Sequence, residues 1–393
     1  MLYSNYTEDL LGLKGTILIK VEEIVNVKHI YLKTNVEATV CPHCHFETKK
    51  VHAYRNQIVK DTEIGGLQSV LHINKRRYRC ESCGHTFYEK LPFLKRYQRI
   101  TQRLMIKVIN DYRHEYSTKR IAEMNHLSPG IATRIFDKIS YPKPKLPKVL
   151  SIDEFKGNAG RKFQCILTNP VMHQVLDILP TKKSEDIRAY FGNYSMNERK
   201  KVKYLVMDMS GQFRDIIISC FPEAQIVTDK FHVCRYGIWA MEKIRKDFQK
   251  SLKPEDRKWF KRSRWIMISH SRNLKEEDIN QLTIMLSYSN RLRNAYYTKE
   301  AFFRFMESQN IEEAKSKLKH LQLAVHVVDL PEFTDLYAMI KRWEPYILRA
   351  FSSGYTNGYT EGCNNKIKVL KRNCYGVRNF SRFRNRILHM MAA

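Results

Sequence analysis

Leu150-Ser151-Ile152-Asp153-Glu154-Phe155 is an apolar run that ends on acids. The same order returns in Tyr204-Leu205-Val206-Met207-Asp208. Short apolar runs of this kind are typical of strands buried in a sheet. A carboxylate at such a strand end is held rigidly, and adjacent strands bring two of them together. We therefore expect Asp153 and Asp208 to share a site that a divalent ion would stabilise.

The segments around these two runs alternate between strand and helix patterns. The predicted strands cover residues 149–155, 163–168, 175–179, 202–207 and 224–228. One helix is predicted over 184–194, with Ser184 as its N-cap, and another over 213–220. Three strands followed by alternating helix and strand predict a mixed α/β sheet.

Two further stretches frame this α/β pattern. Residues 238–353 contain no glycine, and Leu282, Met285, Leu286, Leu292 and Tyr296 fall near one helical face, which predicts an all-helical insertion. Prolines at 142, 144 and 147, interleaved with lysines, predict a stiff linker. The predicted division is a zinc-binding β module over 1–95, a helix-turn-helix domain over 96–141, a linker over 142–147, a first α/β part over 148–237, a helical insertion over 238–353 and a C-terminal helical part over 354–393.

Four cysteines in the N-terminal region form two pairs with the spacing of a metal site. Cys41 and Cys44 make the first pair, and Cys80 and Cys83 the second, among short strand patterns. Four thiolates are the tetrahedral set that zinc prefers, so we expect a structural zinc ion. The alternative is four unrelated cysteines. Three histidines nearby are interpreted as neighbours of the site, since four sulfurs already complete it: His43, His45 and His85.

The next segment has the pattern of a helix-turn-helix. One helix is predicted over 117–124 and a second over 127–136, with Ser128 as the cap of the second helix and Pro129 in its first turn. An ordinary pair of short helices is the alternative. If the second helix enters a major groove, Thr133 and Arg134 face the bases. The predicted DNA contacts of this domain are Lys119, Arg120, Thr133 and Arg134.

The overall charge points to a polyanionic partner. The 393 residues include 69 Lys and Arg against 40 Asp and Glu, a formal net charge of +29. Each phosphate that such a surface neutralises releases counterions. Charge alone does not separate DNA from RNA, from an anionic membrane or from a basic protein with no specific target. No apolar stretch approaches the roughly 18 residues of a membrane span, and the N-terminus shows no signal pattern. Nine cysteines without a signal pattern predict a reducing cytoplasm.

Two more acids and a basic tail complete the candidate site. Glu361 opens a helix-like segment in which eight Lys or Arg follow a single acid. Asp229 also ends an apolar run, so it competes with Asp208 as a metal ligand, and His232 follows it closely. Taken singly, each acid is more often a solvated strand end or the first residue of a helix than a metal ligand, and His232 alone is more often a buried, satisfied histidine. The DNA contacts predicted in the tail, against a solvated terminal helix, are Lys366, Lys368, Lys371, Arg372, Arg378 and Arg382.

Together these motifs resemble those of bacterial insertion-sequence transposases of the ISL-three family. The resemblance covers nearly the whole chain, and its most specific part is T-E-G-x-N-N-K-I-K-x-x-K-R followed by Y-G-x-R-N-F. It implies an RNase-H-like DDE catalytic domain with Asp153, Asp208 and Glu361 as the metal-binding triad. Asp229 and His232 match the D-x-x-H signature seen beside the second aspartate. Whether Glu154 or Asp229 shares in metal binding stays open.

The resemblance implies a DNA transposase that binds the terminal inverted repeats of its element. With Mg²⁺ or Mn²⁺ it would cleave phosphodiesters and transfer strands to target DNA, as at least a dimer assembled on DNA. The expected location is the cytoplasm, at the nucleoid. Two alternatives remain at this point: a catalytically inactive zinc-containing DNA-binding regulator, and a metal-dependent nuclease that cuts without joining.

Overall fold

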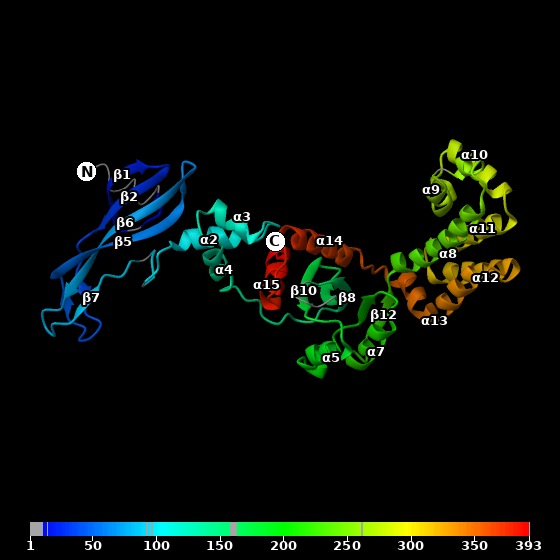
Figure 1. The fold of residues 1–393 in the computed structure, drawn as a ribbon. Coiled ribbons are helices and arrows are strands. Elements are labelled where there is room, and N and C mark those ends of the chain that lie inside the picture. The colour runs from blue at the N-terminus through cyan, green and yellow to red at the C-terminus, as the bar shows by residue number, and fades with distance from the viewer. Residues whose placement is uncertain are drawn as a thin grey trace.

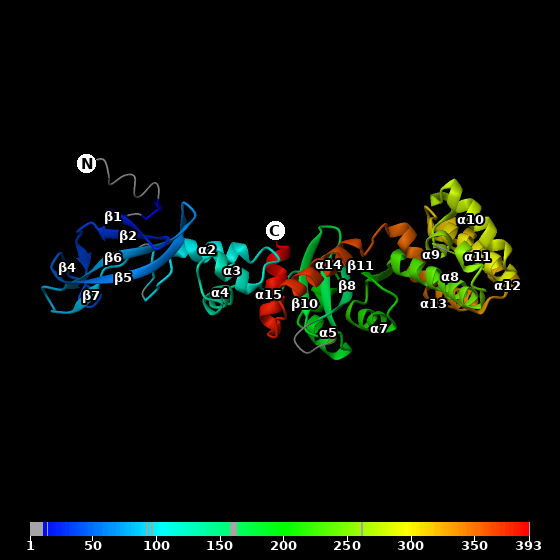
Figure 2. The same ribbon diagram turned by 45° about the horizontal axis from the view of Figure 1, so that its top comes forward.

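The computed structural model describes residues 11–13, 15–91, 93–95, 97–157, 163–260 and 262–392. Residues 1–10, where a signal pattern was not expected, lie outside this part. Figures 1 and 2 show an elongated molecule with an N-terminal sheet, a small helical unit, a central sheet with its helices, and a larger helical unit at the far end. The C-terminal helix lies in the middle of this row, between the small helical unit and the central sheet.

The N-terminal sheet has the strand order β1-β2-β6-β5, with β7 added beside β6. Its strands are β1 (Thr16–Ile24), β2 (Val27–Thr34), β5 (Val51–Ile64), β6 (Leu67–Arg79) and β7 (Thr86–Tyr88), and a separate small pair is β3 (Thr39–Val40) with β4 (Glu47–Thr48). The sequence predicted only short strands here, but β5 and β6 form a hairpin of 14 and 13 residues. Pairing of β6 with β2 ends at Asn74, and the part of β6 beyond it is Lys75-Arg76-Arg77-Tyr78-Arg79, a basic run without the apolar alternation from which a strand is predicted.

The helix-turn-helix pattern is confirmed as α2 (Gln102–Asp111), α3 (Thr118–Met124) and α4 (Pro129–Phe136). The Ser128 side chain caps α4 by accepting a hydrogen bond from the Ile131 N–H, as predicted. The unit is tied to the N-terminal sheet through Asp61 of β5, which is buried. Its Oδ1 accepts hydrogen bonds from Thr101 Oγ1 at 2.6 Å and Arg103 Nε at 2.7 Å, at the start of α2.

The central sheet has the order β10-β9-β8-β11-β12 and confirms the predicted mixed α/β sheet. Its strands are β8 (Val149–Lys156), β9 (Phe163–Asn169), β10 (Gln174–Leu179), β11 (Tyr204–Met207) and β12 (Gln225–Thr228), and its short helices are α5 (Ser184–Gly192), α6 (Met196–Arg199) and α7 (Gly211–Cys220). β8, β9 and β10 are antiparallel neighbours, whereas β11 is parallel to both β8 and β12. The prediction that Ser184 caps α5 is wrong: the N-cap is Lys183, and the Ser184 hydroxyl accepts a hydrogen bond from Gln212 instead.

Two C-terminal helices complete the central unit, α14 (Gly358–Asn373) and α15 (Phe380–Met391). α15 also packs against the helix-turn-helix. Arg382 makes two 2.7 Å hydrogen bonds to the Asp137 carboxylate, and buried Arg386 donates to the carbonyls of His114 and Tyr116. His389 lies 2.8 Å from the Ile109 carbonyl. The helix-turn-helix is therefore docked on the central unit by side chains that come from the end of the chain.

Between β12 and α14 the described residues form helices only: α8 (Lys230–Ser251), α9 (Ser263–Ile268), α10 (Glu276–Ser287), α11 (Asn290–Met306), α12 (Ile311–Val328) and α13 (Pro331–Ser353), with short 3₁₀ turns at Arg257–Phe260 and Ser271–Asn273. The apolar residues predicted on one helical face are buried, but they belong to two helices. Leu282, Met285 and Leu286 lie on α10, whereas Leu292 and Tyr296 lie on α11, because Ser289 caps a new helix between them. No helix in the described ranges is long and apolar enough to span a membrane.

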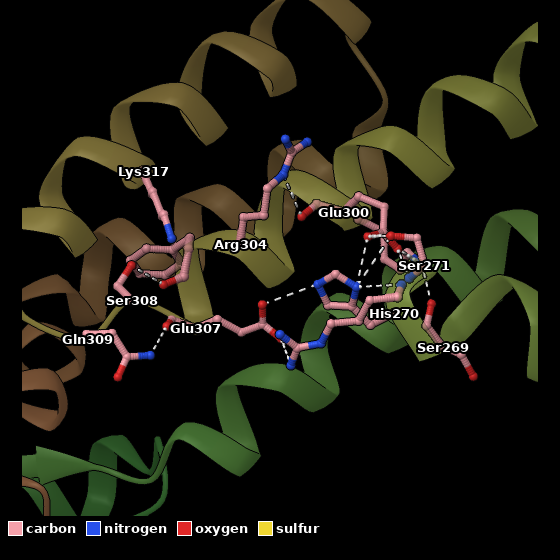
Figure 3. A network of polar contacts seen from close by, with 12 residues as sticks. Ser269, His270, Ser271, Glu300, Arg304, Glu307, Ser308, Gln309 and Lys317 are labelled. Carbon is pink, nitrogen blue, oxygen red and sulfur yellow. Dashed lines mark hydrogen bonds and ion pairs between the residues drawn. The ribbon is translucent and has the colours of Figure 1, made fainter. Parts of the chain in front are cut away.

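A polar network braces this helical unit where the turn after α9 meets α11 (Figure 3). The His270 ring lies between two carboxylates, with Nδ1 3.4 Å from Glu300 and Nε2 3.3 Å from Glu307. Lys299, which is fully buried, lies 2.5 Å from Glu300 and donates a hydrogen bond to the Ser269 carbonyl. Burial of these charges is offset by their mutual pairing, so the network fixes α11 against the preceding turn.

Gly237 sets the distance between α8 and α11. A Cβ at this position would lie 2.2 Å from the ring of Phe302, which is fully buried. We expect Gly237→Ala to destabilise the helical unit by about 1–3 kcal/mol through overpacking, although alanine is the better helix former. All four tryptophans lie between residues 239 and 343, so their fluorescence reports the thermal unfolding of this unit.

Gly130→Ala is the matched control, because a Cβ on Gly130 in α4 would meet nothing within 4 Å. That variant should unfold at or slightly above the temperature of the wild-type protein, as measured by circular dichroism, because alanine is the better helix former. An unchanged unfolding midpoint for Gly237→Ala would show that α8 and α11 do not pack this closely.

Candidate active site and zinc centre

Three aspartates lie at the same level of three adjacent parallel strands. Val206 of β11 pairs with Ser151 of β8 on one side and with Val227 of β12 on the other. Two residues further along each strand come Asp208, Asp153 and Asp229. Asp153 is still inside β8, three residues before its end, whereas the other two follow their strands directly. The carboxyl-end edge of the sheet thus gathers all three side chains.

Glu361 reaches this edge from α14, whose first turn is fastened to the sheet. Ser151 Oγ donates a hydrogen bond to Asn357 Oδ1 and accepts one from Thr360 Oγ1 at 3.2 Å. Thr360 Oγ1 also lies 2.8 Å from Thr168 Oγ1 of β9. Ser151, Asn357 and Thr360 are all fully buried. Because these bonds fix the first turn of α14 over β8, they set the position of Glu361.

The tightest group of possible ligands differs from the triad that the resemblance implied. Potential ligand atoms of Asp229, His232 and Glu361 all lie within 4.8 Å of one another, and His232 Nε2 is 3.3 Å from Glu361 Oε1. Asp153 is not part of this tight group, and both of its carboxylate oxygens accept hydrogen bonds. Oδ2 accepts a 2.8 Å hydrogen bond from Asn364 Nδ2, and Oδ1 accepts one from the Glu154 backbone N–H.

The acids of this edge lie in an environment that disfavours negative charge. Burial, together with the nearby Asp208 and Glu361 charges, raises the pKa of Asp153 to about 7. Burial also raises the pKa values of Asp208, Asp229 and Glu361, although the His232 ring opposes the rise in all three. Carboxyls gathered at low dielectric repel one another when ionised, and a cation between them relieves that repulsion.

The side chains at this edge suit a divalent cation. Among the described residues, Asp208 Oδ1 and Asp229 Oδ2 are buried oxygens with no hydrogen-bond partner. Buried polar atoms are normally bonded, so such oxygens mark places where a ligand is expected. Several carboxylate oxygens and one imidazole form a donor set that hard divalent ions accept. Glu154 contributes less, since its carboxylate lies 2.7 Å from Lys182 Nζ.

The basic residues predicted to contact DNA fall into two groups. Lys366, Lys368, Arg372 and Arg378 are exposed, the first three on α14 beyond Glu361. Lys371 donates instead to the carbonyls of Lys156 and Gly157, which holds the end of β8. Arg382 is bound to Asp137 as described above. A role on DNA remains a prediction for all six residues, but the guanidinium of Arg382 is already occupied by a protein carboxylate.

In the helix-turn-helix, Lys119 and Arg120 are highly exposed at the start of α3, with 81% and 64% of their side chains accessible. Arg134 of α4 is exposed as well. Thr133 is half-buried, and its hydroxyl donates a hydrogen bond to the Pro129 carbonyl within the same helix. Lys119 and Arg120 each lie 3.9 Å from the exposed Glu123 carboxylate, a pairing at the surface that a phosphate can replace, while the Thr133 hydroxyl has a partner within its own helix.

The four predicted cysteines come together at the open end of the long hairpin, where β5 begins and β6 ends. Their sulfurs all lie within 4.8 Å of one another, with 3.7 Å from Cys41 to Cys83 and 3.5 Å from Cys44 to Cys80. Zinc bonds of about 2.3 Å in a tetrahedron place sulfurs about 3.8 Å apart, so the residues fit the ion. Each pair lies in its own backbone turn, and the two turns are of the same kind. The His45 N–H donates a hydrogen bond to the Cys41 carbonyl, and the Gly84 N–H donates one to the Cys80 carbonyl.

Comparison with known proteins identifies the family of this chain. Residues 150–387 match the DDE transposase domain of the ISL3 family, described as "Transposase", and this match covers more than half of the chain. The chain belongs to the ISL3 transposase family. Residues 37–83 match the zinc finger of the IS204, IS1001, IS1096 and IS1165 transposases, and residues 89–140 match the helix-turn-helix domain of ISL3 transposases.

Two curated relatives agree with the family. The chain is 27% identical to the transposase for insertion sequence element IS1001 of Bordetella parapertussis, over 89% of this chain and 88% of the relative. It is 21% identical to the transposase for IS1557 of Mycobacterium tuberculosis, over 58% and 57%. This ISL3 transposase is thus a DNA-binding enzyme of the DDE type. Its family implies a divalent metal at the DDE site, and its Cys₄ cluster implies structural zinc.

Several residues of the active-site edge were missed by the sequence reasoning. Asn364 holds Asp153, and the contacts among Ser151, Asn357 and Thr360 hold α14. Each contact joins residues about 200 positions apart, so no local periodicity reports it. The signal that was available is the unusual polar content of two segments, a serine inside the apolar run of β8 and the paired asparagines of the T-E-G-C-N-N stretch.

Proposed function

We propose that this ISL3 transposase cuts and joins DNA with an RNase-H-like catalytic domain interrupted by the helical insertion 238–353. Asp153, Asp208 and Glu361 would hold the catalytic metal, with Asp229 and His232 beside them. The observation that carries the proposal is the register of β8, β11 and β12, which aligns Asp153, Asp208 and Asp229 at one edge under Glu361. The proposed ion is Mg²⁺, which prefers carboxylate ligands and substrate phosphates.

Each side chain has a separable task in this proposal. When bound, Mg²⁺ supplies Lewis-acid activation of the phosphodiester and of the attacking hydroxyl. His232 orients the Glu361 carboxylate through their 3.3 Å contact, and Asn364 orients Asp153. The exposed cations that follow Glu361 on α14, Lys366, Lys368 and Arg372, would bind the backbone of the same DNA. The protein thereby contributes positioning and charge stabilisation, with no covalent protein–DNA link.

In this proposal the N-terminal parts of the chain recognise the DNA ends. The helix-turn-helix, with Lys119, Arg120 and Arg134 exposed, would bind the terminal inverted repeats, supported by the zinc module. Arg382 and Arg386 of α15 hold the helix-turn-helix against the catalytic unit. A DNA end bound to the helix-turn-helix would therefore be held at a fixed position relative to the catalytic site. Two ends must be processed together, so we propose a dimer on DNA, and nucleoid DNA in the cytoplasm as its place of action.

Asn364→Ala tests the positioning of Asp153. It should lower the cleavage rate about 10–100-fold, because Asp153 loses the amide that fixes it, and it should raise the Mg²⁺ concentration needed for half-maximal rate. Binding of end DNA should not change. The neighbouring Asn365, whose side chain instead accepts a hydrogen bond from Lys368, provides the control Asn365→Ala. Equal cleavage rates for the two variants would show that Asn364 does not position Asp153 for cleavage.

A cleavage and joining assay tests the proposed function as a whole. The purified protein is mixed with DNA ends of its element and a plasmid target, in Mg²⁺ or in chelator. Metal-dependent attachment of the ends to the plasmid is the expected result. Binding without cutting, in Mn²⁺ as well as Mg²⁺, would identify a regulator that has lost catalysis. Cutting without attachment would identify a nuclease.

A further inference from the structure

One face of α8 carries aromatic and cationic side chains in alternation. Phe231, Arg235, Trp239 and Lys243 recur every four residues, and Tyr236 adjoins them. Residues four apart lie on neighbouring turns of the same helix face. We call these five residues the α8 stripe. Its rings are strongly exposed, with 55% of Phe231, 50% of Trp239 and 38% of Tyr236 accessible.

The rest of α8 shows that this exposure is not general along the helix. The opposite face is buried against the helical unit by Val233, Gly237, Ala240, Met241 and Ile244. Within the α8 stripe, the side chains order one another. The Arg235 guanidinium lies 4.9 Å from the centre of the Trp239 ring, and the Tyr236 and Trp239 rings are 5.1 Å apart. Lys243 keeps 65% of its side chain accessible, although Glu332 lies 3.8 Å away.

The α8 stripe begins at the active-site edge. Asp229 caps α8, and the Phe231 ring meets the His232 ring edge-on at 5.9 Å. Burial raises the pKa of Glu361, and the charge of Arg235 is close enough to oppose that rise. In Figure 1, α8 runs from the sheet edge at β12 outward into the helical unit. The stripe therefore leads from the metal-binding edge onto the surface of that unit.

We propose that the α8 stripe binds nucleotides that are unpaired next to the phosphodiester being cut, with bases stacked on Trp239 and Phe231 and phosphates near Arg235 and Lys243. This inference rests on the proposed function and adds a binding site to it. Exposed rings interleaved with cations are the arrangement that holds single strands. A duplex hides the faces of its bases, and an apolar protein partner would offer no anion to the Arg235 guanidinium.

The dimensions of the stripe fit a short single strand. From Phe231 to Trp239 the helix rises about 12 Å at roughly 1.5 Å per residue. Stacked nucleotides advance about 3.4 Å each along a strand, so the rings span about three to four nucleotides. Unpaired nucleotides beside the cut would let a strand bend into a site that a rigid duplex cannot enter, and the stripe would stabilise them.

Trp239→Ala tests this proposal, with Trp265→Ala as the matched control because Trp265 is equally exposed, at 53%, on α9. Cleavage is measured on two end substrates, one fully paired and one with mismatches beside the cut. Trp239→Ala should cut the paired substrate about tenfold more slowly, as expected for one lost base stack, and the mismatched substrate nearly normally. Trp239→Phe should recover most of the rate. An equal deficit on both substrates, or the same deficit in Trp265→Ala, would overturn the proposal.

A binding measurement that requires no cleavage separates this proposal from the proposed function. With Trp259→Phe and Trp265→Phe in place, the remaining tryptophans are Trp239 and the buried Trp343. A single-stranded thymidine oligonucleotide should then quench the fluorescence more than its duplex does at equal concentration. If the oligonucleotide quenches the fluorescence of a protein that does not cut DNA, nucleotide binding by the α8 stripe is supported and the proposed function is not. If the protein cuts DNA but shows no quenching, only the proposal for the α8 stripe is overturned.

Discussion

Asp208→Asn is expected to abolish metal-dependent cleavage while DNA ends remain bound. Asp208 follows β11 at the level of Asp153 and Asp229, and its Oδ1 is buried without a partner among the described residues. Replacing one carboxylate oxygen by an amide nitrogen keeps the shape and removes a ligand and a charge. A loss of about 4 kcal/mol of metal-based stabilisation corresponds to roughly a thousandfold lower rate. The rate is measured on labelled end DNA, and binding by gel shift in chelator.

Asp215→Asn is the matched control for this result. Asp215 lies on α7, seven residues further along, with 62% of its side chain accessible and a 3.0 Å ion pair to Arg214. Its replacement should leave both cleavage and binding unchanged. If Asp208→Asn lost binding in proportion to cleavage, its role would be structural. If it cut at the wild-type rate, the assignment of Asp208 as a ligand would be wrong.

Cys41→Ser is expected to remove zinc and unfold the tip of the N-terminal module. The four sulfurs are placed for one tetrahedral ion, and each backbone turn around them depends on the two cysteines it contains. Zinc binding in such small sites contributes about 10 kcal/mol to folding at neutral pH, far more than the few buried side chains of β3 and β4 supply. Zinc per chain, measured by atomic absorption, should fall from one to nearly none. Binding of end DNA should weaken with it.

Cys374→Ser provides the control, since Cys374 is a thiol outside the cluster. It should retain one zinc per chain and normal DNA binding. Chelation of the wild-type protein should reproduce the Cys41→Ser result, and added zinc should reverse it. Full zinc content in Cys41→Ser would show that the ion is not held by this cluster.

The sequence predicted the strands of the central sheet because each is a short apolar run buried on both faces. It predicted the second helix of the helix-turn-helix from Ser128 and Pro129, since capping is a local interaction. It did not predict that α10 and α11 are separate helices. Their apolar residues keep a common helical period across the break, and only the cap at Ser289 marks the interruption.

In the basic tail the structure adds partners that local patterns do not report. Arg382, Arg384 and Arg386 all bind protein groups: Asp137, Asp177 and two backbone carbonyls. A guanidinium looks the same in sequence whether its partner is a phosphate or a carboxylate more than 200 residues away. The partner is set by how the chain folds back on itself.

The cysteine cluster, the helix-turn-helix, the mixed sheet and the candidate acids could be predicted from the sequence, because each depends on residue spacing within short segments. Which of those acids come close to one another depends on the three-dimensional fold. The parallel register of β8, β11 and β12 puts Asp229 level with Asp153 and Asp208, and buried bonds from Ser151 to Asn357 and Thr360 bring Glu361 to them. Such proximity depends on strand pairing and on contacts across about 200 residues, and no local period encodes either.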